Sequence, residues 1–312
     1  MGHRDIGSKS FSEQEPLVSV LVLTYQHVAY IKECLDSILM QHTSFPIEIL
    51  LGEDDSSDGT REICERYAAQ HPDRIRLFLG HRADVLYILG KPTGRRNLLN
   101  LLSAAKGRYI ALCEGDDYWT DPFKLQKQVD FLEEHSEYSC CFHSVQLLIN
   151  GDLHAYPIPD EVDKMNITLE DILSKRNFVT TPSVMYRSVF IPFPRFLLKA
   201  PYGDMALFTL ASKTGKAACL DEDMAVWRQT AKGLWTGLDE QAKLDGKLYM
   251  YRSLYPALTK PQRAIVDEKK AELLELFAHS RYPFSPGRKR LYLHYLRFKH
   301  RNHTSFYNIG WT

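Results

Sequence analysis

The apolar positions in the first half of the chain follow two alternating patterns. Short runs rich in β-branched residues, typical of strands covered on both faces, alternate with segments of helical spacing such as Val28, Ile31, Leu35 and Ile38. The strand-like runs are residues 17–24, 47–51, 75–79 and 109–113. Strands separated by helices pair in parallel, so the pattern predicts an α/β fold with a Rossmann-related, mostly parallel sheet flanked by helices.

This rhythm changes after about residue 140. Asn150-Gly151 is a hairpin signal, and the chain has a helical pattern from about residue 239. We therefore expect a flexible tail, one large domain in two halves, and a helical C-terminal extension. The corresponding ranges are 1–15, 16–238 with halves 16–140 and 141–238, and 239–312.

Composition narrows the functional classes. The 312 residues are 44% apolar and 25% charged with zero net charge, so the bulk charge gives no case for a nucleic-acid partner. The six cysteines form no C-x-x-C pair, which indicates buried, reduced thiols in a cytoplasmic protein. No run of 18 apolar residues is present, so we expect at most peripheral contact with the inner face of a membrane.

Three polar clusters stand directly after predicted strands. Thr24-Tyr25 follows the first strand, "GEDDSSDGT" at 52–60 follows the second, and "EGDDYW" at 114–119 follows the fourth. Ligands of open parallel sheets bind beyond the carboxyl ends of the strands, so the three clusters predict one site. Glycine-rich phosphate loops are absent, and the carboxylates at 114–117 suit Mg²⁺ or Mn²⁺, which could bridge to phosphate oxygens.

The two acidic motifs and their order carry a family resemblance. A strand, "EDDSSDGT" and a helix, followed by "GRYIALCEGDDYWTDPFKLQKQVDFL", resemble the nucleotide-sugar-binding half of inverting family 2 glycosyltransferases with the GT-A fold. The resemblance covers roughly residues 16–235. It implies a GT-A-like domain with a nucleotide-binding half at 16–140 and an acceptor half at 141–238.

The resemblance also implies site residues. Asp54 would accept the uracil N3–H of a UDP-sugar, with Thr24 and Tyr25 lining the base. The metal, Mn²⁺ or Mg²⁺, would be held by Glu114, Asp116 and Asp117, where Glu114 replaces the commoner aspartate. The remaining donor contacts would come from Asp116 near the ribose and from Arg95, Asn97 and Arg228.

A later motif, "YGDMALF" at 202–208, matches the family's base motif and makes Asp204 the expected catalytic base. A carboxylate there would take the proton of an acceptor hydroxyl during attack on the sugar C1. A single displacement inverts the anomeric configuration. The implied enzyme is a glycosyltransferase, of the hexosyltransferase class, that extends a surface polysaccharide or related glycan.

Simpler interpretations stay open for each motif. "EGDDYW" is also typical of a solvated turn, and an aspartate at a helix start such as Asp204 commonly serves the helix dipole. A nucleotidyltransferase is one alternative function, although residues 24–30, "TYQHVAY", contain no glycine. A non-catalytic sugar-nucleotide-binding module is the other.

The C-terminal extension is basic. Seven Lys and Arg residues and no Asp or Glu occur from residue 281 onward. If this segment is helical, its cations and His294 form one stripe and its apolar side chains form the next. These stripes are Arg290, His294, Arg297 and Arg301, and Leu291, Tyr295 and Phe298. A basic, aromatic helix at 281–303 could contact an anionic membrane that carries a lipid-linked acceptor, or it could pack back on the acidic domain.

Overall fold

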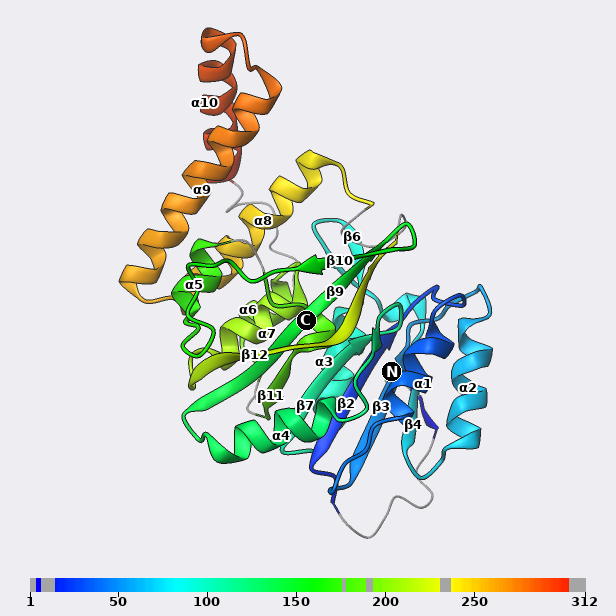
Figure 1. Cartoon of the computed structure of the whole chain (residues 1–312). Coiled ribbons are helices and arrows are strands. Elements are labelled where there is room, and N and C mark those ends of the chain that lie inside the picture. Colours follow the sequence, from blue (N-terminus) through cyan, green and yellow to red (C-terminus); the bar gives the residue numbers. More distant parts are fainter. Residues whose placement is uncertain (1–3, 7–14, 176–177, 189–192, 231–236, 303–312) are drawn as a thin grey trace. The chain divides into compact units, whose positions relative to one another are not determined.

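The computed structural model describes residues 4–6, 15–175, 178–188, 193–230 and 237–302. Contacts within the chain divide it into two compact units, residues 1–236 and 237–312. Figure 1 shows the elements of both units in the order of the sequence. Each unit is described by itself.

The first unit is built on a ten-stranded sheet with the order β1-β4-β3-β2-β7-β11-β9-β12-β8, in which β10 pairs with β9. Its strands are β1 (Arg4–Ile6), β2 (Val18–Thr24), β3 (Ile47–Glu53), β4 (Ile75–Leu79), β7 (Tyr109–Glu114), β8 (Tyr118–Trp119), β9 (Tyr138–Ile149), β10 (Asp152–Tyr156), β11 (Met185–Arg187) and β12 (Lys216–Gln229). Strands β4, β3, β2 and β7 are mutually parallel, which confirms the four predicted strands and their pairing.

Parallel pairing is concentrated in this first half. Strand β11 is antiparallel to both β7 and β9, whereas β12 runs parallel to β9, so the complete sheet is mixed. The predicted hairpin is present, because Asn150 and Gly151 adopt φ of 53° and 93° between β9 and β10. Residues 4–6, within the segment expected to be a flexible tail, form β1 antiparallel to β4. Strands β5 (Leu86–Ile88) and β6 (Lys91–Thr93) form a separate hairpin.

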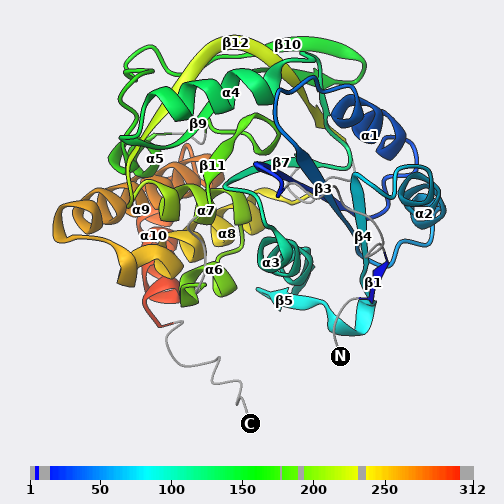
Figure 2. The ribbon, with the colours of Figure 1, turned by 90° about the horizontal axis from the view of Figure 1, so that it is seen from below.

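Helices cover both faces of the sheet, as the sequence predicts. Figure 2 shows α3 on one side of the parallel strands and α1, α2 and α4 on the other. The helices of the first unit are α1 (Ile31–Leu39), α2 (Thr60–Gln70), α3 (Arg95–Ala104), α4 (Lys124–Glu134), α5 (Leu169–Ser174), α6 (Arg195–Lys199) and α7 (Gly203–Ala211). Single 3₁₀ turns occur at Arg82–Asp84 and Thr181–Ser183. The helical spacing seen in the sequence included Val28, but α1 begins only at Ile31. Residues 27–30 form a turn instead.

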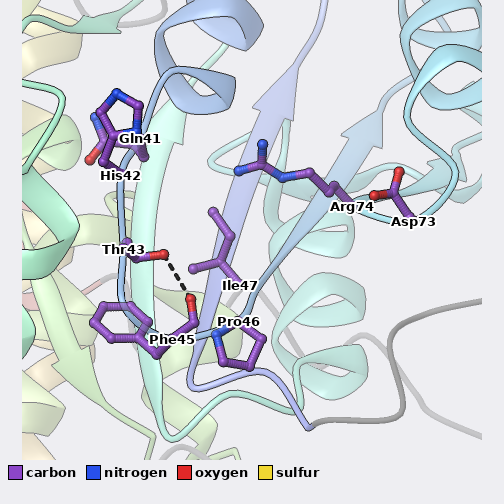
Figure 3. A pocket seen from close by; sticks show the side chains of 8 residues that line it. All are labelled: Gln41, His42, Thr43, Phe45, Pro46, Ile47, Asp73 and Arg74. Atoms are coloured by element: carbon purple, nitrogen blue, oxygen red, sulfur yellow. Dashed lines mark hydrogen bonds between the residues drawn. The ribbon is translucent and has the colours of Figure 1, made fainter.

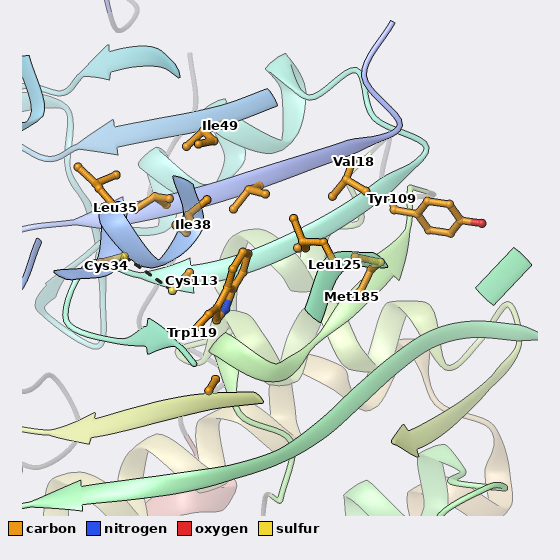
Figure 4. Packing of buried hydrophobic residues seen from close by; sticks show 14 of the residues in the cluster. Val18, Cys34, Leu35, Ile38, Ile49, Tyr109, Cys113, Trp119, Leu125 and Met185 are labelled. Carbon is orange, nitrogen blue, oxygen red and sulfur yellow. Dashed lines mark hydrogen bonds between the residues drawn. The ribbon is translucent and has the colours of Figure 1, made fainter. Parts of the chain in front are cut away.

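Alternation along β2 explains how the core forms. Successive strand residues face opposite sides, so Val18, Val20 and Val22 share one face and pack in a buried cluster with residues of α1 and α4. Figure 4 shows part of this cluster, including Cys34 and Cys113, whose sulfur atoms lie 3.7 Å apart. All six cysteines are buried and free, as the sequence indicated.

The second unit is helical. It contains α8 (Glu240–Leu254), a 3₁₀ turn at Tyr255–Ala257, α9 (Lys260–Arg281) and α10 (Pro286–Asn302). Its core is a cluster of apolar residues drawn from the three helices: Leu244, Leu248, Leu274, Ala278, Leu293 and Leu296. Within the described residues, no helix combines the length and the hydrophobicity needed to cross a membrane.

A close contact between α3 and β3 generates a stability prediction. Asn97 Nδ2 donates to the Gly52 carbonyl (2.8 Å), and a Cβ at Gly52 would lie 2.0 Å from Asn97 Oδ1. We expect Gly52→Ala to cost about 2–3 kcal/mol, because the added Cβ must displace the buried Asn97 side chain and disrupt its hydrogen bond to Gly52. Gly94→Ala, where nothing lies within 4 Å of the added Cβ, is the control. In urea denaturation, Gly52→Ala should be less stable than Gly94→Ala. Equal stability of the two variants would contradict the contact between α3 and β3.

Candidate active site

Strand register brings the three polar clusters to one edge of the sheet. Thr24 at the end of β2 pairs with Glu53 at the end of β3, and Leu23 pairs with Glu114 at the end of β7. The backbone N–H of Asp54 donates to the Thr24 carbonyl at 3.1 Å. Polar groups that are far apart in sequence therefore meet beyond the carboxyl ends of the parallel strands.

The loop after β3 is organised by a buried glutamate. Glu53 is fully buried and accepts hydrogen bonds from the backbone N–H of Ser56 at 2.6 Å and of Asp55 at 3.3 Å. Its charge is balanced by Arg61, whose Nε lies 2.5 Å from the Glu53 carboxylate. Asp55 takes a left-handed backbone conformation with φ of 64°. Glu53 therefore shapes the loop from which Asp54 projects.

Asp54 and Tyr25 lie around one arginine. Arg82 Nη1 is 3.2 Å from the Asp54 carboxylate, and the Arg82 guanidinium lies 4.3 Å from the centre of the Tyr25 ring. Burial raises the pKa of Asp54 to about 6, an effect that the positive charge of Arg82 partly offsets. Asp54 is 5% exposed, whereas Tyr25 is 37% exposed and open to a stacking partner.

Sequence reasoning did not single out Arg82. The signal for it was its position three residues after β4, because β4 is parallel to β3 and its end lies at the same edge of the sheet. His27 is a second residue that was missed. Its Nε2 lies 3.8 Å from Asp116 and its Nδ1 lies 3.3 Å from the Thr24 hydroxyl, so it joins the β2 cluster to the acidic cluster.

The turn after β7 gathers three carboxylates. One carboxylate oxygen from each of Glu114, Asp116 and Asp117 lies within 4.8 Å of the other two. The turn is held by the Asp117 N–H, which donates to the Glu114 carbonyl at 3.0 Å. A Cβ on Gly115 would lie 2.5 Å from the Thr24 hydroxyl oxygen, so only glycine allows the turn to approach β2 this closely.

The donor set of this acidic cluster fits a divalent cation. Asp117 is 1% exposed, and its Oδ1 accepts the Arg228 backbone N–H at 2.8 Å. Its Oδ2 is buried without a hydrogen-bond partner among the described residues. A buried carboxylate oxygen without a partner, next to two further carboxylates, is the arrangement expected of ligands for Mg²⁺ or Mn²⁺.

Electrostatics in the acidic cluster favour added positive charge. The pKa of Asp117 is raised well above its ordinary value by burial and then by Asp116 and Glu114. Glu114 is open to solvent but surrounded by many protein atoms, and this partial loss of hydration raises its pKa to about 8, with Asp116 and Asp204 adding to the shift. Asp204 therefore lies close enough to Glu114 to influence its charge.

Arg228 stabilises the acidic cluster through hydrogen bonds. Its guanidinium donates to the Asp116 carbonyl at 2.5 Å and to the Glu33 carboxylate at 2.7 Å. It also lies over the rings of Tyr30 and Tyr118, 4.6 and 5.2 Å from their centres. The expected donor contact of Arg228 stays a prediction, and the contacts named here already engage its guanidinium.

Two other expected donor contacts lie in the interior. Arg95 and Asn97, on the first turn of α3, are 4% and 1% exposed. Asn97 supports β3 through Gly52, and Arg95 Nη2 donates to the Ala200 carbonyl at 2.7 Å. Asp204 lies in the first turn of α7, which begins at Gly203. Asp204 is thus near enough to influence the pKa of Glu114, and Arg95 is buried against the 200–203 turn that precedes Asp204.

The fold and the acidic turn agree with a family model. Residues 19–190, more than half of the chain, match the model described as glycosyl transferase family 2. The chain belongs to glycosyl transferase family 2. The match includes the loop at 52–60 and the acidic cluster, and it confirms the family that the two motifs indicated.

Curated relatives in this family include an uncharacterized protein of Mycobacterium tuberculosis, 36% identical over 220 residues, which are 70% of this chain and 60% of that protein. The uncharacterized glycosyltransferase EpsJ of Bacillus subtilis is 40% identical over 103 residues, 33% of this chain and 27% of that protein. The chain therefore spans about 60% of the length of the mycobacterial relative.

Solved structures show the same fold. TarS 1–349 of S. aureus in complex with UDP-GlcNAc has a TM-score of 0.55 and 20% identity, with 86% of this chain and 73% of that chain covered. The mannosyltransferase PcManGT from Pyrobaculum calidifontis, in complex with GDP-Man and Mn²⁺, has a TM-score of 0.53 and 14% identity, with 96% and 91% covered. These matches confirm the GT-A-like architecture of this family 2 chain.

A pocket of about 490 Å³ lies elsewhere on the family 2 domain. Its lining includes Gln41 and His42 after α1, Ile47 at the start of β3, and Asp73 and Arg74 before β4. Figure 3 shows these side chains around the amino end of β3. The acidic cluster stands beyond the carboxyl ends of the strands, so this pocket is separate from the candidate active site.

Proposed function

We propose that this family 2 chain is a metal-dependent, inverting glycosyltransferase that moves a sugar from a nucleotide sugar to a hydroxyl of a glycan or lipid-linked acceptor. The observation that carries the proposal is the convergence of Glu114, Asp116 and Asp117 at the sheet edge that also holds Asp54. Asp204, from the acceptor half, lies close enough to shift the pKa of Glu114. Carboxylates to which we assign donor, cation and acceptor chemistry would thus share one region.

A UDP-sugar is the donor class that Asp54 and Tyr25 support. The Asp54 carboxylate would accept the uracil N3–H while the exposed Tyr25 ring provides a stacking surface, with Thr24 beside it. Arg82, already against both residues, would limit the space for the base. TarS binds UDP-GlcNAc whereas PcManGT binds GDP-Man, so the fold alone does not select the base.

The chemistry assigned to the chain's own residues is simple. Glu114, Asp116 and Asp117 would hold the cation, which when bound neutralises charge on the departing diphosphate. Asp204 would take the proton from the acceptor hydroxyl as its oxygen attacks the sugar C1 opposite the leaving group. One displacement inverts the anomeric centre.

Metal binding provides the first test of this proposal. Asp117→Asn keeps an oxygen to accept the Arg228 N–H but removes a negative charge, so we expect at least a tenfold loss of Mn²⁺ affinity in isothermal titration calorimetry. UDP release from a UDP-sugar should fall in parallel. Asp221→Asn, at a carboxylate 76% exposed and paired with Lys164, is the control and should bind Mn²⁺ normally.

The same assay separates the alternatives. A non-catalytic binding module would bind UDP and Mn²⁺ without releasing UDP from any UDP-sugar. A nucleotidyltransferase would form a sugar nucleotide from a nucleoside triphosphate and a sugar phosphate, and it would not release UDP. Either result with wild-type protein would refute the glycosyltransferase proposal.

Base recognition by Asp54 predicts a dependence on pH. The pKa of Asp54 is about 6, so the carboxylate is ionised at pH 7.5 and gains a proton below pH 6. Uridine, whose N3–H needs an acceptor, should lose affinity about tenfold per pH unit below 6. Cytidine, whose N3 is an acceptor, should bind more tightly to the protonated form. Ligand-observed NMR between pH 5 and 8 avoids phosphate and metal, and Asp54→Asn should abolish both trends.

Identical pH profiles for the two nucleosides would show that Asp54 does not read N3. Tight binding of guanosine with no uridine binding would instead transfer the donor assignment to a GDP-sugar. Neither outcome would affect the Mn²⁺ titration, because neither nucleoside carries a phosphate.

We propose a membrane contact for the second unit through α10. Leu293 and Leu296 are buried against the other helices of this unit, whereas Leu291, Tyr295 and Phe298 are 79%, 55% and 61% exposed. At 3.6 residues per turn the exposed three form one stripe on the side opposite the buried pair. Cations of the same helix border this stripe, a combination that favours an anionic lipid surface.

Vesicle flotation tests this contact. Wild-type protein should float with vesicles containing phosphatidylglycerol and not with pure phosphatidylcholine vesicles. The triple variant Leu291→Ser, Tyr295→Ser, Phe298→Ser removes the exposed apolar stripe and should lose at least 90% of this binding. It should still fold, because the residues replaced do not belong to the core of the second unit. Leu276→Ser, at a 59% exposed position of α9, is the matched control. Absence of wild-type flotation, or equal flotation of the triple variant, would refute the proposal.

A further inference from the structure

A single guanidinium contacts both ends of the turn that leads into α7. Arg95 Nη2 donates to the carbonyl of Ala200, the C-cap residue that follows α6, at 2.7 Å. At the other end of the turn, a Cβ on Gly203 would lie only 2.7 Å from Arg95 Nη1. Asp204 follows Gly203 directly, so Arg95 fixes the segment from which the expected base projects.

Burying the charged side chain of Arg95 costs hydration free energy. Its side chain is 4% exposed, and its Nε and Nη1 have no hydrogen-bond partner among the described residues. Burial lowers the pKa of Arg95 to about 10, and the negative charge of Asp204 partly opposes this shift. A buried cation is tolerated when an opposite charge compensates for its lost hydration, and Asp204 supplies that charge.

We propose that Arg95 is a positioning residue that fixes the 200–203 turn and thereby orients the Asp204 carboxylate toward the acceptor hydroxyl. The inference rests on the proposed function, which makes Asp204 the base. It replaces the expectation that Arg95 contacts the donor, for which a guanidinium would serve as a phosphate ligand. The two roles differ in their kinetic consequences, because a positioning residue affects proton transfer whereas a phosphate ligand affects nucleotide binding.

Arg95→Gln should therefore lower kcat about 100-fold, the loss that a displacement of about 1 Å in a reacting group can produce. The KM for the donor and the Kd for UDP with Mn²⁺ should stay within twofold of wild type. UDP release is measured with Mn²⁺, with water as acceptor, using whichever of UDP-glucose, UDP-galactose and UDP-N-acetylglucosamine wild-type protein hydrolyses fastest. Arg95→Lys, which keeps the positive charge but not the planar guanidinium with its several N–H donors, should recover part of the kcat that Arg95→Gln loses.

Gly203→Ala approaches the same contact from the other side and leaves Arg95 in the sequence. Its added Cβ would displace the guanidinium, so kcat should again fall while UDP affinity is kept. Arg76→Gln is the matched control, because Arg76 Nη1 donates to the Ala104 carbonyl at 3.1 Å at the opposite end of α3. It should lose stability with kcat unchanged. Hydrogen exchange at residues 200–206 should accelerate in Arg95→Gln and not in Arg76→Gln.

The double variant of Arg95→Gln and Asp204→Asn decides whether Arg95 acts through Asp204. If it does, the double variant should be no slower than Asp204→Asn alone, which should lose on the order of 10³-fold in kcat. Weakened UDP binding in Arg95→Gln with kcat unchanged would overturn the inference and restore the phosphate role. Full activity of Asp204→Asn, or no UDP release by wild-type protein that binds UDP and Mn²⁺, would instead refute the proposed function.

Discussion

The site depends on holding three mutually repelling carboxylates within one short turn. Like charges at this spacing raise one another's pKa and oppose folding of the turn unless other interactions compensate. The protein compensates with the Asp117 N–H bond to Glu114 and with two hydrogen bonds from Arg228, which reaches the turn from β12. Positive charge supplied by a cation would relieve the remaining repulsion, so metal and donor binding should be coupled in the proposed enzyme.

Arginines in this domain act mainly on carboxylates and carbonyls of the protein itself. Arg61 neutralises the buried Glu53 that shapes one loop, Arg82 pairs with Asp54, and Arg228 holds the acidic turn. The Arg82 and Arg228 interactions join segments that the β-strands bring together only after folding, whereas Arg61 lies eight residues after Glu53. These ion pairs and hydrogen bonds stabilise the polar edge, and the inferred role of Arg95 extends them to α7.

Sequence reasoning placed backbone elements better than it placed side chains. The strands of the first half, their parallel pairing and the convergence of the loops after β2, β3 and β7 all followed from the spacing of apolar runs. By contrast, Arg82 was missed, and the burial of Arg95 and Asn97 did not follow from the sequence, so their donor contacts stay predictions. A local pattern shows that a residue is charged or polar, but the direction of a long side chain depends on neighbours from distant segments.

The amino-acid sequence by itself determined the alternation of strands and helices, the family and the acidic turn, because hydrophobic periodicity and short motifs are local properties of the chain. Only the tertiary structure decided which carboxylates face which arginines. Strand order and register bring Arg228 to Asp117 across 111 positions of sequence, and folding brings Arg95 of α3 to the Ala200 carbonyl in the turn before Asp204. Charge interactions weaken with distance in space, and sequence separation gives no measure of that distance.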